Sequence, residues 1–310
     1  MTGAGAASLA FVKSDGFMSV PGSPNYYSPG RNPTVEELTL ERVLTRMRTE
    51  DNAEAVDSLA QNLEGSFGLS WTMSNDTHGN IRDIVFNDGG NGFTSGRAAL
   101  SRWYVGTEYL PTPSDPPSVR ERVLKGCIPL EYSQTYTQGG EIRESLTMGY
   151  ADEERNTSIT PTGVSRATNG NDVPFHGCQL DADGAQVSLL QSATLSISNM
   201  YRFYRDETPT PADATLAAPT TTLELEAIYD EQQDTQLGIA YGSTSSPTST
   251  QDRLEAIPLT LSYDVQGNTV AEYSLPSCKP QSTSWNSLID GENNLTQSQT
   301  FHVNGGVSIA

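Results

Sequence analysis

Histidines, cysteines and paired acids are the side chains in this sequence whose types and spacing could support catalysis or metal binding. The histidines are His78, His176 and His302, and only His176 has another metal-ligating residue close by, Cys178. One His-x-Cys pair supplies two of the four ligands that a structural zinc site needs. The sequence therefore predicts no metal site.

Motifs for nucleophilic catalysis and nucleotide binding are also missing. The sequence contains no G-x-S-x-G, G-x-G-x-x-G, phosphate loop or H-E-x-x-H. Asp181–Gly184 resembles the start of a calcium loop, but the twelfth position of that loop is Ser192 instead of Glu. Adjacent acids such as Glu36-Glu37 and Glu153-Glu154 are typical of a solvated acidic surface. We therefore predict no catalytic residue, no cofactor and no enzymatic activity.

The 310-residue chain is strongly acidic and poor in lysine. Its formal net charge is −20, and its lysines are Lys13, Lys125 and Lys279 alone. Such carboxylate-rich surfaces resemble those of halophilic proteins, whose charges are screened within about 3 Å in molar salt. Tight binding of nucleic acid would need clustered Lys and Arg side chains, so the composition disfavours a nucleic-acid-binding function.

Cysteine usage and the N-terminus indicate the compartment. Three cysteines are an odd number in a long chain, which favours buried thiols over a disulfide framework. The first 15 residues lack the basic region of a secretory signal, and no apolar run reaches 18 residues. We expect synthesis in the cytoplasm and no membrane association. Three Asn-x-Ser/Thr sequons matter only if the chain is exported.

The sequence repeats several landmarks in the same order. The glycine hairpin of residues 128–146 returns at 257–275, offset by 129, and the alternating strand 66–73 returns at 222–229, offset by 156. Other pairs are the Thr-Leu strands starting at 39 and 194, amphipathic segments 80–86 and 236–242, and Phe-His dipeptides at 175 and 301. Ordered repetition predicts a duplicated β unit. The alternative is two unrelated β domains.

We therefore predict a mainly β fold of two tandem sandwich or barrel units with a short helix in each. The expected divisions are an N-terminal arm 1–34, a first domain 35–180 and a second domain 181–310. An offset that falls from 156 to 129 predicts an insertion at 87–122 in the first domain. Its Trp103, Tyr104 and Tyr109 are the aromatic type that anchors subunit interfaces.

The order of elements also carries a family resemblance. It is formed by a Pro-rich lead "GSPNYYSPGRNPT", "GSFGLSWTMSND" running into a helix, a glycine hairpin, "SATLSISN", and a closing "YSLPSCKP" and "TQSQTFHV". Together these segments resemble the major tail tube proteins of tailed double-stranded DNA viruses. With the acidic, lysine-poor composition, the resemblance indicates a virus of halophilic archaea.

The resemblance implies a structural virion protein. Family subunits close into rings with a continuous inner β-barrel, and stacked rings form a tube that passes viral DNA without specific binding. Since rings of single-unit chains are typically sixfold, a doubled chain implies a homotrimer with pseudo-sixfold symmetry, with a homohexamer as the alternative. Implied partners are further copies and other tail proteins at the tube ends. The implied location is the virion tail, and the host cytoplasm during assembly.

An acidic channel would repel DNA phosphates. Acids on the polar faces of the two hairpins are candidates for lining it, namely Glu131, Glu141, Glu144, Asp264 and Glu272. The alternative places them on the outer, salt-adapted surface.

Two other function classes remain open from the residues alone. A secreted or cell-surface β-sandwich adhesin would use the Ser, Thr and sequon content, but the expected absence of a signal peptide disfavours it. A polysaccharide-active enzyme would use tyrosines in a groove, but no paired acid site accompanies them.

Overall fold

The computed structural model describes residues 7–47, 57–87, 92–93, 96–109, 118–230, 240–243, 249–288 and 294–309. In the N-terminal half it has β1 (Ala7–Lys13), β2 (Arg31–Met47), β3 (Asp57–Thr72), α1 (Asn75–Val85), β4 (Ser101–Tyr109), β5 (Ser118–Thr137), β6 (Arg143–Tyr150) and β7 (Asp152–Asn156). The C-terminal half has the 3-10 turn η2 (Phe175–Gly177), β8 (Cys178–Ala182), β9 (Ala185–Gln186), β10 (Leu190–Ser198), β11 (Tyr201–Tyr204), β12 (Asp213–Leu216), β13 (Thr220–Ile228), β14 (Ile257–Val265), β15 (Asn268–Asn286), β16 (Thr296–Asn304) and β17 (Ser308–Ile309).

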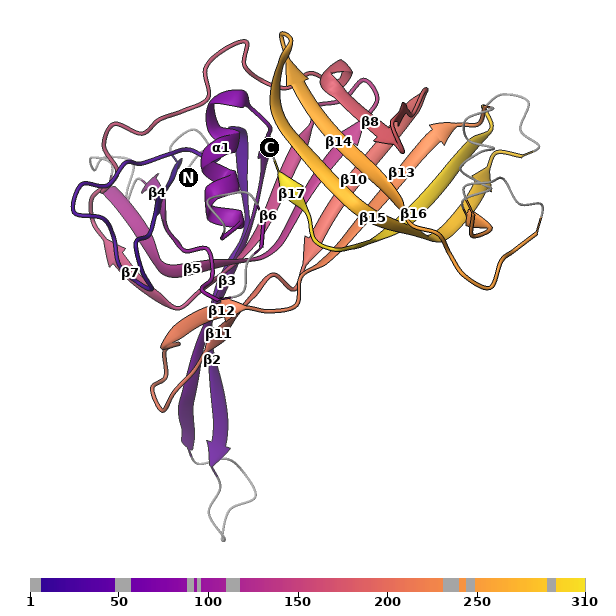
Figure 1. The fold of residues 1–310 in the computed structure, drawn as a ribbon. Helices are drawn as coiled ribbons and strands as arrows, with labels where there is room; N and C mark the ends of the chain where they lie inside the picture. Colours follow the sequence, from indigo (N-terminus) through magenta and orange to yellow (C-terminus); the bar gives the residue numbers. More distant parts are fainter. Residues whose placement is uncertain are drawn as a thin grey trace.

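A single antiparallel sheet runs through both halves (Figure 1). Its order is β2-β3-β6-β5-β10-β13-β16-β15-β14-β8-β9, and β11 and β12 form a separate hairpin. The halves meet where β5 pairs with β10. The predicted mainly β fold is confirmed.

Strand β5 belongs to two layers. Its N-terminal part pairs with β4 and β7, and its C-terminal part pairs with β6 and β10. Gly126 has φ +60°, which a glycine adopts without strain, and a bulge follows Pro129. These two features bend β5 out of the β1-β4-β5-β7 layer and into the main layer.

Strand β15 is used in the same way. Residues 268–278 pair with β14, residues 273–274 pair with β17, and residues 277–286 pair with β16. A bulge follows Pro280, as one follows Pro129 in β5. β14 also pairs with β8, as β4 pairs with β1.

These pairings correct two of the predicted sequence equivalences. The hairpin at 128–146 joins β5 to β6 in the main layer, whereas the hairpin at 257–275 joins β14 to β15, the place that β4 and β5 hold in the first half. Phe175 lies in the turn η2, whereas Phe301 lies in β16. Glycine turns and Phe-His dipeptides are local signals, so they recur without marking the same position in a fold.

The core of the first half lies between the two layers and α1. Phe67, Leu69 and Trp71 alternate along β3 and are buried, and Trp103 on β4 stacks on Phe11 of β1 with ring centroids 4.8 Å apart. The helix predicted after this strand is confirmed as α1, which buries Ile81, Ile84 and Val85. The second predicted helix lies mostly outside the described residues.

Two predicted segments turn out to be part of this core. The expected arm 1–34 contains β1, whose register with β4 runs from Ala7 to Lys13. The expected insertion 87–122 contains β4 and the start of β5. Residues 101–109 of this segment therefore pair with β1 and β5 inside their own chain.

A long hairpin of β2 and β3 extends away from the body (Figure 1). It is paired as far as Met47 and Asp57. The β11-β12 hairpin lies beside it, and the Leu63 amide donates to the Pro209 carbonyl at 3.0 Å.

Candidate assembly surfaces

A cluster of buried, hydrogen-bonded polar side chains lies between the halves in the described structure. Glu144 on β6 accepts hydrogen bonds from Trp71 Nε1 at 2.7 Å and from the Tyr132 hydroxyl, and lies 2.9 Å from His78 Nδ1. Tyr273, on β15 of the other half, accepts from Gln134 Nε2 at 2.6 Å. The cluster therefore joins α1, β3, β5 and β6 to β15.

This cluster is closed to substrates because its members are almost fully buried. Burial would raise the pKa of Glu144, but the His78 ring and the hydrogen bonds from Tyr132 and Trp71 outweigh it and lower that pKa. The carboxylate is thus held charged inside the core. Across the described ranges, no group of three or more His, Cys, Asp or Glu residues could hold a metal ion. The arrangement stabilises the fold.

The five predicted channel acids lie in four different settings. Glu131 is exposed on β5 in the main layer, and Glu141 is exposed before β6, where its carboxylate accepts from Thr72 Oγ1 at 2.6 Å. Asp264 and Glu272 are half-buried on β14 and the N-terminal part of β15, outside the main layer. Glu144 is a correction, since a side chain with 0% exposure lines no channel.

The aromatic residues of 87–122 are corrected in the same way. Trp103 has 0% exposure and Tyr104 has 4%, because both pack inside their own chain. They therefore have no free side-chain surface for another subunit. Tyr109 pairs with Ser118 through its backbone, and its side chain lies outside the described set.

The main layer consists of β2, β3, β6, β5, β10, β13, β16 and residues 277–286 of β15. Its polar face, opposite the core, is rich in hydroxyl side chains, and registered partners on it include Ser133 with Ser145 and Ser196, and Thr222 with Ser196. Glu131, Glu224 and Glu226 lie on the same face, which also carries Arg143 and Lys279.

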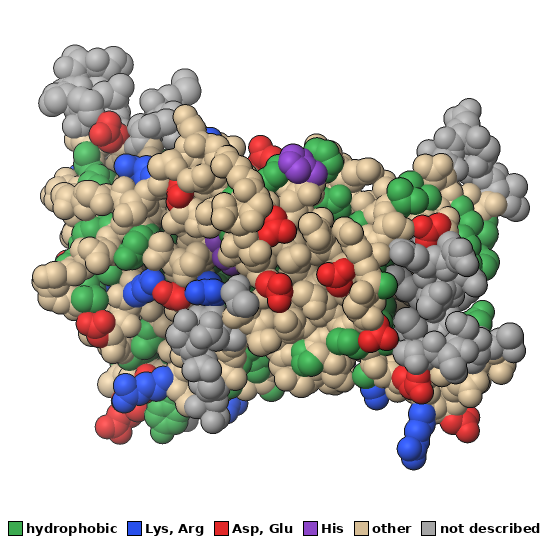
Figure 2. Space-filling view, turned by 45° about the horizontal axis from the view of Figure 1, so that its top comes forward, with side chains coloured by type: hydrophobic (Ala, Val, Ile, Leu, Met, Phe, Trp, Pro, Cys, Tyr) green, Lys and Arg blue, Asp and Glu red, His purple; other side chains and the backbone are tan. Residues whose placement is uncertain are grey.

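The polar face is shallowly hollowed where β5, β6 and β10 meet. A groove of about 230 Å³ there is lined by Glu131 and by serine and threonine side chains. More generally, acidic side chains are dispersed over the molecular surface among uncharged polar groups, as Figure 2 shows for one side. Such a surface offers hydrogen-bonding hydroxyls and negative charge without a continuous basic track.

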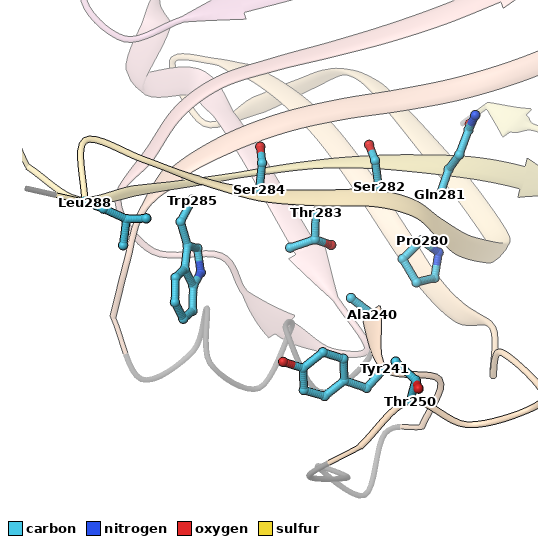
Figure 3. A pocket seen from close by; sticks show the side chains of 10 residues that line it. All are labelled: Ala240, Tyr241, Thr250, Pro280, Gln281, Ser282, Thr283, Ser284, Trp285 and Leu288. Carbon is cyan, nitrogen blue, oxygen red and sulfur yellow. The ribbon is translucent and has the colours of Figure 1, made fainter.

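The two ends of the main layer are open edges. Strand β2 pairs only with β3, and residues 279–286 of β15 pair only with β16, as far as the described chain extends. A groove of about 520 Å³ lies along this end of β15. Figure 3 shows Trp285, Thr283 and Pro280 pointing toward Tyr241 on one side, and Ser282 and Ser284 pointing to the other. Open edges of this kind template pairing with another chain.

A comparison with sequence families identifies the family of the chain. The family described as "Phage tail tube protein" matches residues 7–301, nearly the whole chain. The chain belongs to the phage tail tube family. No curated protein matches this tail tube protein.

Membership gives the tail tube protein a structural role in the virion tail, where it assembles into a tube with other tail proteins. The family is structural rather than catalytic. No helix among the described residues is long and apolar enough to cross a membrane.

Sequence reasoning missed the buried cluster and the open β15 edge. The cluster had a signal, because Glu144 shares the alternation of Ile142, Leu146 and Met148, which are all buried. Gln134 likewise lies between Tyr132 and Tyr136 on one strand face. Trp285, in the polar stretch "STSWNS", gave no periodic signal.

Proposed function

We propose that this tail tube protein closes into rings whose inner wall is the main layer, with its polar face toward a channel for viral DNA. The observation that supports this most is that the main layer spans both halves and ends in two open edges, at β2 and at residues 279–286 of β15. Joining these edges between successive copies would close the main layer and remove its two edges, as in a barrel.

We further propose that the chain is a tandem of two tube units that divide near the expected boundary between 35–180 and 181–310, with β1 of the expected arm in the first unit and all of β8 in the second. In support, β1, β4, β5 and β7 pair with one another as β8, β14, β15 and β17 do. The layers β2-β3-β6-β5 and β10-β13-β16-β15 also share one order. Each chain then supplies two units, so three chains give a pseudo-sixfold ring. A homohexamer with one unit inside and one outside is the competing arrangement.

The channel wall would carry hydroxyls, the carboxylates of Glu131, Glu224 and Glu226, and the separate cations of Arg143 and Lys279. Carboxylates repel DNA phosphates, and hydroxyls form only weak, exchangeable contacts, so the wall would not retain the genome during ejection. Glu131, one of the five acids predicted to line the channel, would line it in this arrangement. Asp264 and Glu272, on the other layer, would face away from the channel.

The composition supports a host that lives in high salt. A net charge of −20 with only three lysines suits a virus of halophilic archaea, whose subunits must associate despite like charge. Assembly would begin in the host cytoplasm, before the tube joins the virion.

Electron microscopy of the purified protein in molar salt tests the proposed function. Rings or rods with a central channel are expected, and monodisperse single chains would contradict the tube. Class averages down the axis decide the copy number. Three large outer lobes around an approximately sixfold wall support the trimer, and six equivalent outer lobes contradict it.

A further inference from the structure

We propose that the open edge of β2 in one copy pairs antiparallel with residues 283–286 of β15 in the next copy, in the register that β10 and β5 adopt within the chain. The β5-β10 pairing is called the internal joint below. This inference rests on the proposed ring and adds which residues form the contact between copies.

The internal joint aligns β5 with β15 through their bulges. Pro129 pairs with Met148 before the bulge of β5, and Pro280 pairs with Phe301 before the bulge of β15. Three residues beyond each proline the strands are regular again. Tyr132 of β5 thus corresponds to Thr283 of β15, and Ser133 corresponds to Ser284.

The same comparison aligns β10 with β2. Ser196 of β10 pairs with Thr222 of β13, and Thr39 of β2 pairs with Ser66 of β3. Phe67 of β3 pairs with Met148, and Leu223 of β13 pairs with Phe301, the partners of the two aligned prolines. Ser66 and Thr222, one residue before them, are therefore equivalent, and Thr39 holds the position of Ser196. One residue further, Leu40 holds the position of Ile197.

Transferring the internal register then fixes the contact between copies. Ser196 pairs with Ser133, and Ile197 pairs with Tyr132. Thr39 of one copy should therefore lie opposite Ser284 of the next, and Leu40 opposite Thr283. The two-residue bulge of β2, between Glu36 and Thr39, falls opposite Trp285.

Exposed apolar side chains lie on or directly beside the same two edges. Leu40 is 48% exposed, Trp285 42% and Leu288 61%. In the internal joint, by contrast, Ile197 and Gln134, which correspond to Leu40 and Trp285, are at most 1% exposed. Leu40 and Trp285 thus expose apolar side chains at positions that the internal joint buries, and a groove of about 520 Å³ lies beside Trp285.

Charge favours the pairing as well. The edge of β2 carries exposed Glu36, Glu37 and Glu41. Residues 280–288 contain no charged side chain, in a protein with 38 acidic residues. The open edge of β15 therefore does not repel the glutamates on β2 of the next copy, as a like-charged strand directly opposite would.

Cysteine crosslinking tests the register. Directly opposed residues of an antiparallel pair have Cβ atoms about 4.5–5.5 Å apart, within reach of a disulfide after small adjustments, whereas diagonal neighbours are about 7–8 Å apart. The variant Thr39→Cys/Ser284→Cys should therefore crosslink between copies on oxidation of assembled tubes. Thr39→Cys/Asn286→Cys, shifted by two residues, is the matched control and should crosslink at least tenfold less.

The result is read on non-reducing gels beside micrographs of the same samples. Oligomers joined by disulfides only in the Ser284→Cys variant support the inference, and a ladder ending at three chains fits the trimer. Tubes without this crosslink, or equal crosslinking of both variants, would overturn the register and leave the tube intact. Failure of the unaltered protein to form rings would overturn the proposed function, and this inference with it.

Replacing Trp285, the exposed aromatic residue at the open edge of β15, tests the contact between copies in a second way. Trp285→Ala should lower the sedimenting, assembled fraction at least tenfold in molar salt while its melting temperature as single chains changes little. Phe175→Ala, which removes another exposed aromatic from neither edge, is the control. Equal assembly of the two variants would contradict a joint at Trp285.

Discussion

Glu144 shows how a single carboxylate can be kept charged inside a β core. Its oxygens meet the Trp71 indole, the Tyr132 hydroxyl and the His78 ring, so both carboxylate oxygens have a hydrogen-bond partner. Buried charges persist only when they are paired and hydrogen-bonded in this way. The cost of disturbing one partner is therefore high.

Replacing Glu144 with Gln should lower stability at neutral pH by roughly 1–3 kcal/mol, because an amide NH₂ then faces hydrogen-bond donors. The folded-state pKa of Glu144 lies below its ordinary value of 4.5. The carboxylate's contribution is therefore present above that value and is lost as the pH falls through the folded pKa.

The difference in melting temperature between the unaltered protein and Glu144→Gln should thus be large at pH 7 and shrink toward pH 3. Glu141→Gln, at an exposed acid, is the control and should differ little at either pH. A difference that stays constant with pH would mean that the carboxylate's charge is not what stabilises the cluster.

At the scale of single elements, β3 is shaped by its glycines as much as by its apolar residues. A Cβ on Gly65 would lie 2.1 Å from Tyr150 Cζ, whereas a Cβ on Gly68 would come no closer than 3.4 Å to Glu36. The Tyr150 ring crosses the bare backbone of Gly65 to donate its hydroxyl to the Thr39 carbonyl. The ring thereby ties β6 to β2 across β3.

We expect Gly65→Ala to destabilise the protein by about 1–3 kcal/mol, as overpacking of a filled site does. Gly68→Ala, three residues along the same strand, should cost less than about 1 kcal/mol. Denaturant titration of both variants measures the difference. Equal losses would show that backbone freedom, rather than space for Tyr150, explains the glycine.

The positions of strands and of the helix were easier to predict from the sequence than the pairing between strands. The alternation of Phe67, Leu69, Trp71 and Met73 marks β3 as half-buried, and the structure confirms this burial. The amphipathic run after it marks α1. The use of β5 and β15 in two layers was not predictable, because a strand's local pattern is the same whichever layer it joins. Pairing between distant strands is decided by packing that a single sequence does not display.

At the scale of the whole molecule, net charge opposes every contact between copies. With −20 per chain, repulsion extends about 30 Å at 10 mM salt but only about 3 Å at 1 M. We therefore expect tubes or rings in molar salt and separation of copies on dilution into 10 mM salt. Light scattering across this range measures it, with a neutral osmolyte of equal osmolality as the control. Equal or greater assembly at 10 mM would contradict the expectation.

The internal joint would also change how formation of the proposed ring depends on protein concentration. Because β5 and β10 belong to one polypeptide, their pairing has an effective concentration set by the chain, whereas pairing of β2 with β15 of another copy depends on protein concentration. Only the latter carries the translational entropy cost of association.

Dilution in molar salt should therefore separate rings into whole chains whose β10 amides remain protected from hydrogen exchange, while β2 and the end of β15 exchange rapidly. A doubled chain would in this way halve the number of contacts that must be found by diffusion, and a ring would form at lower protein concentration than one built from single units.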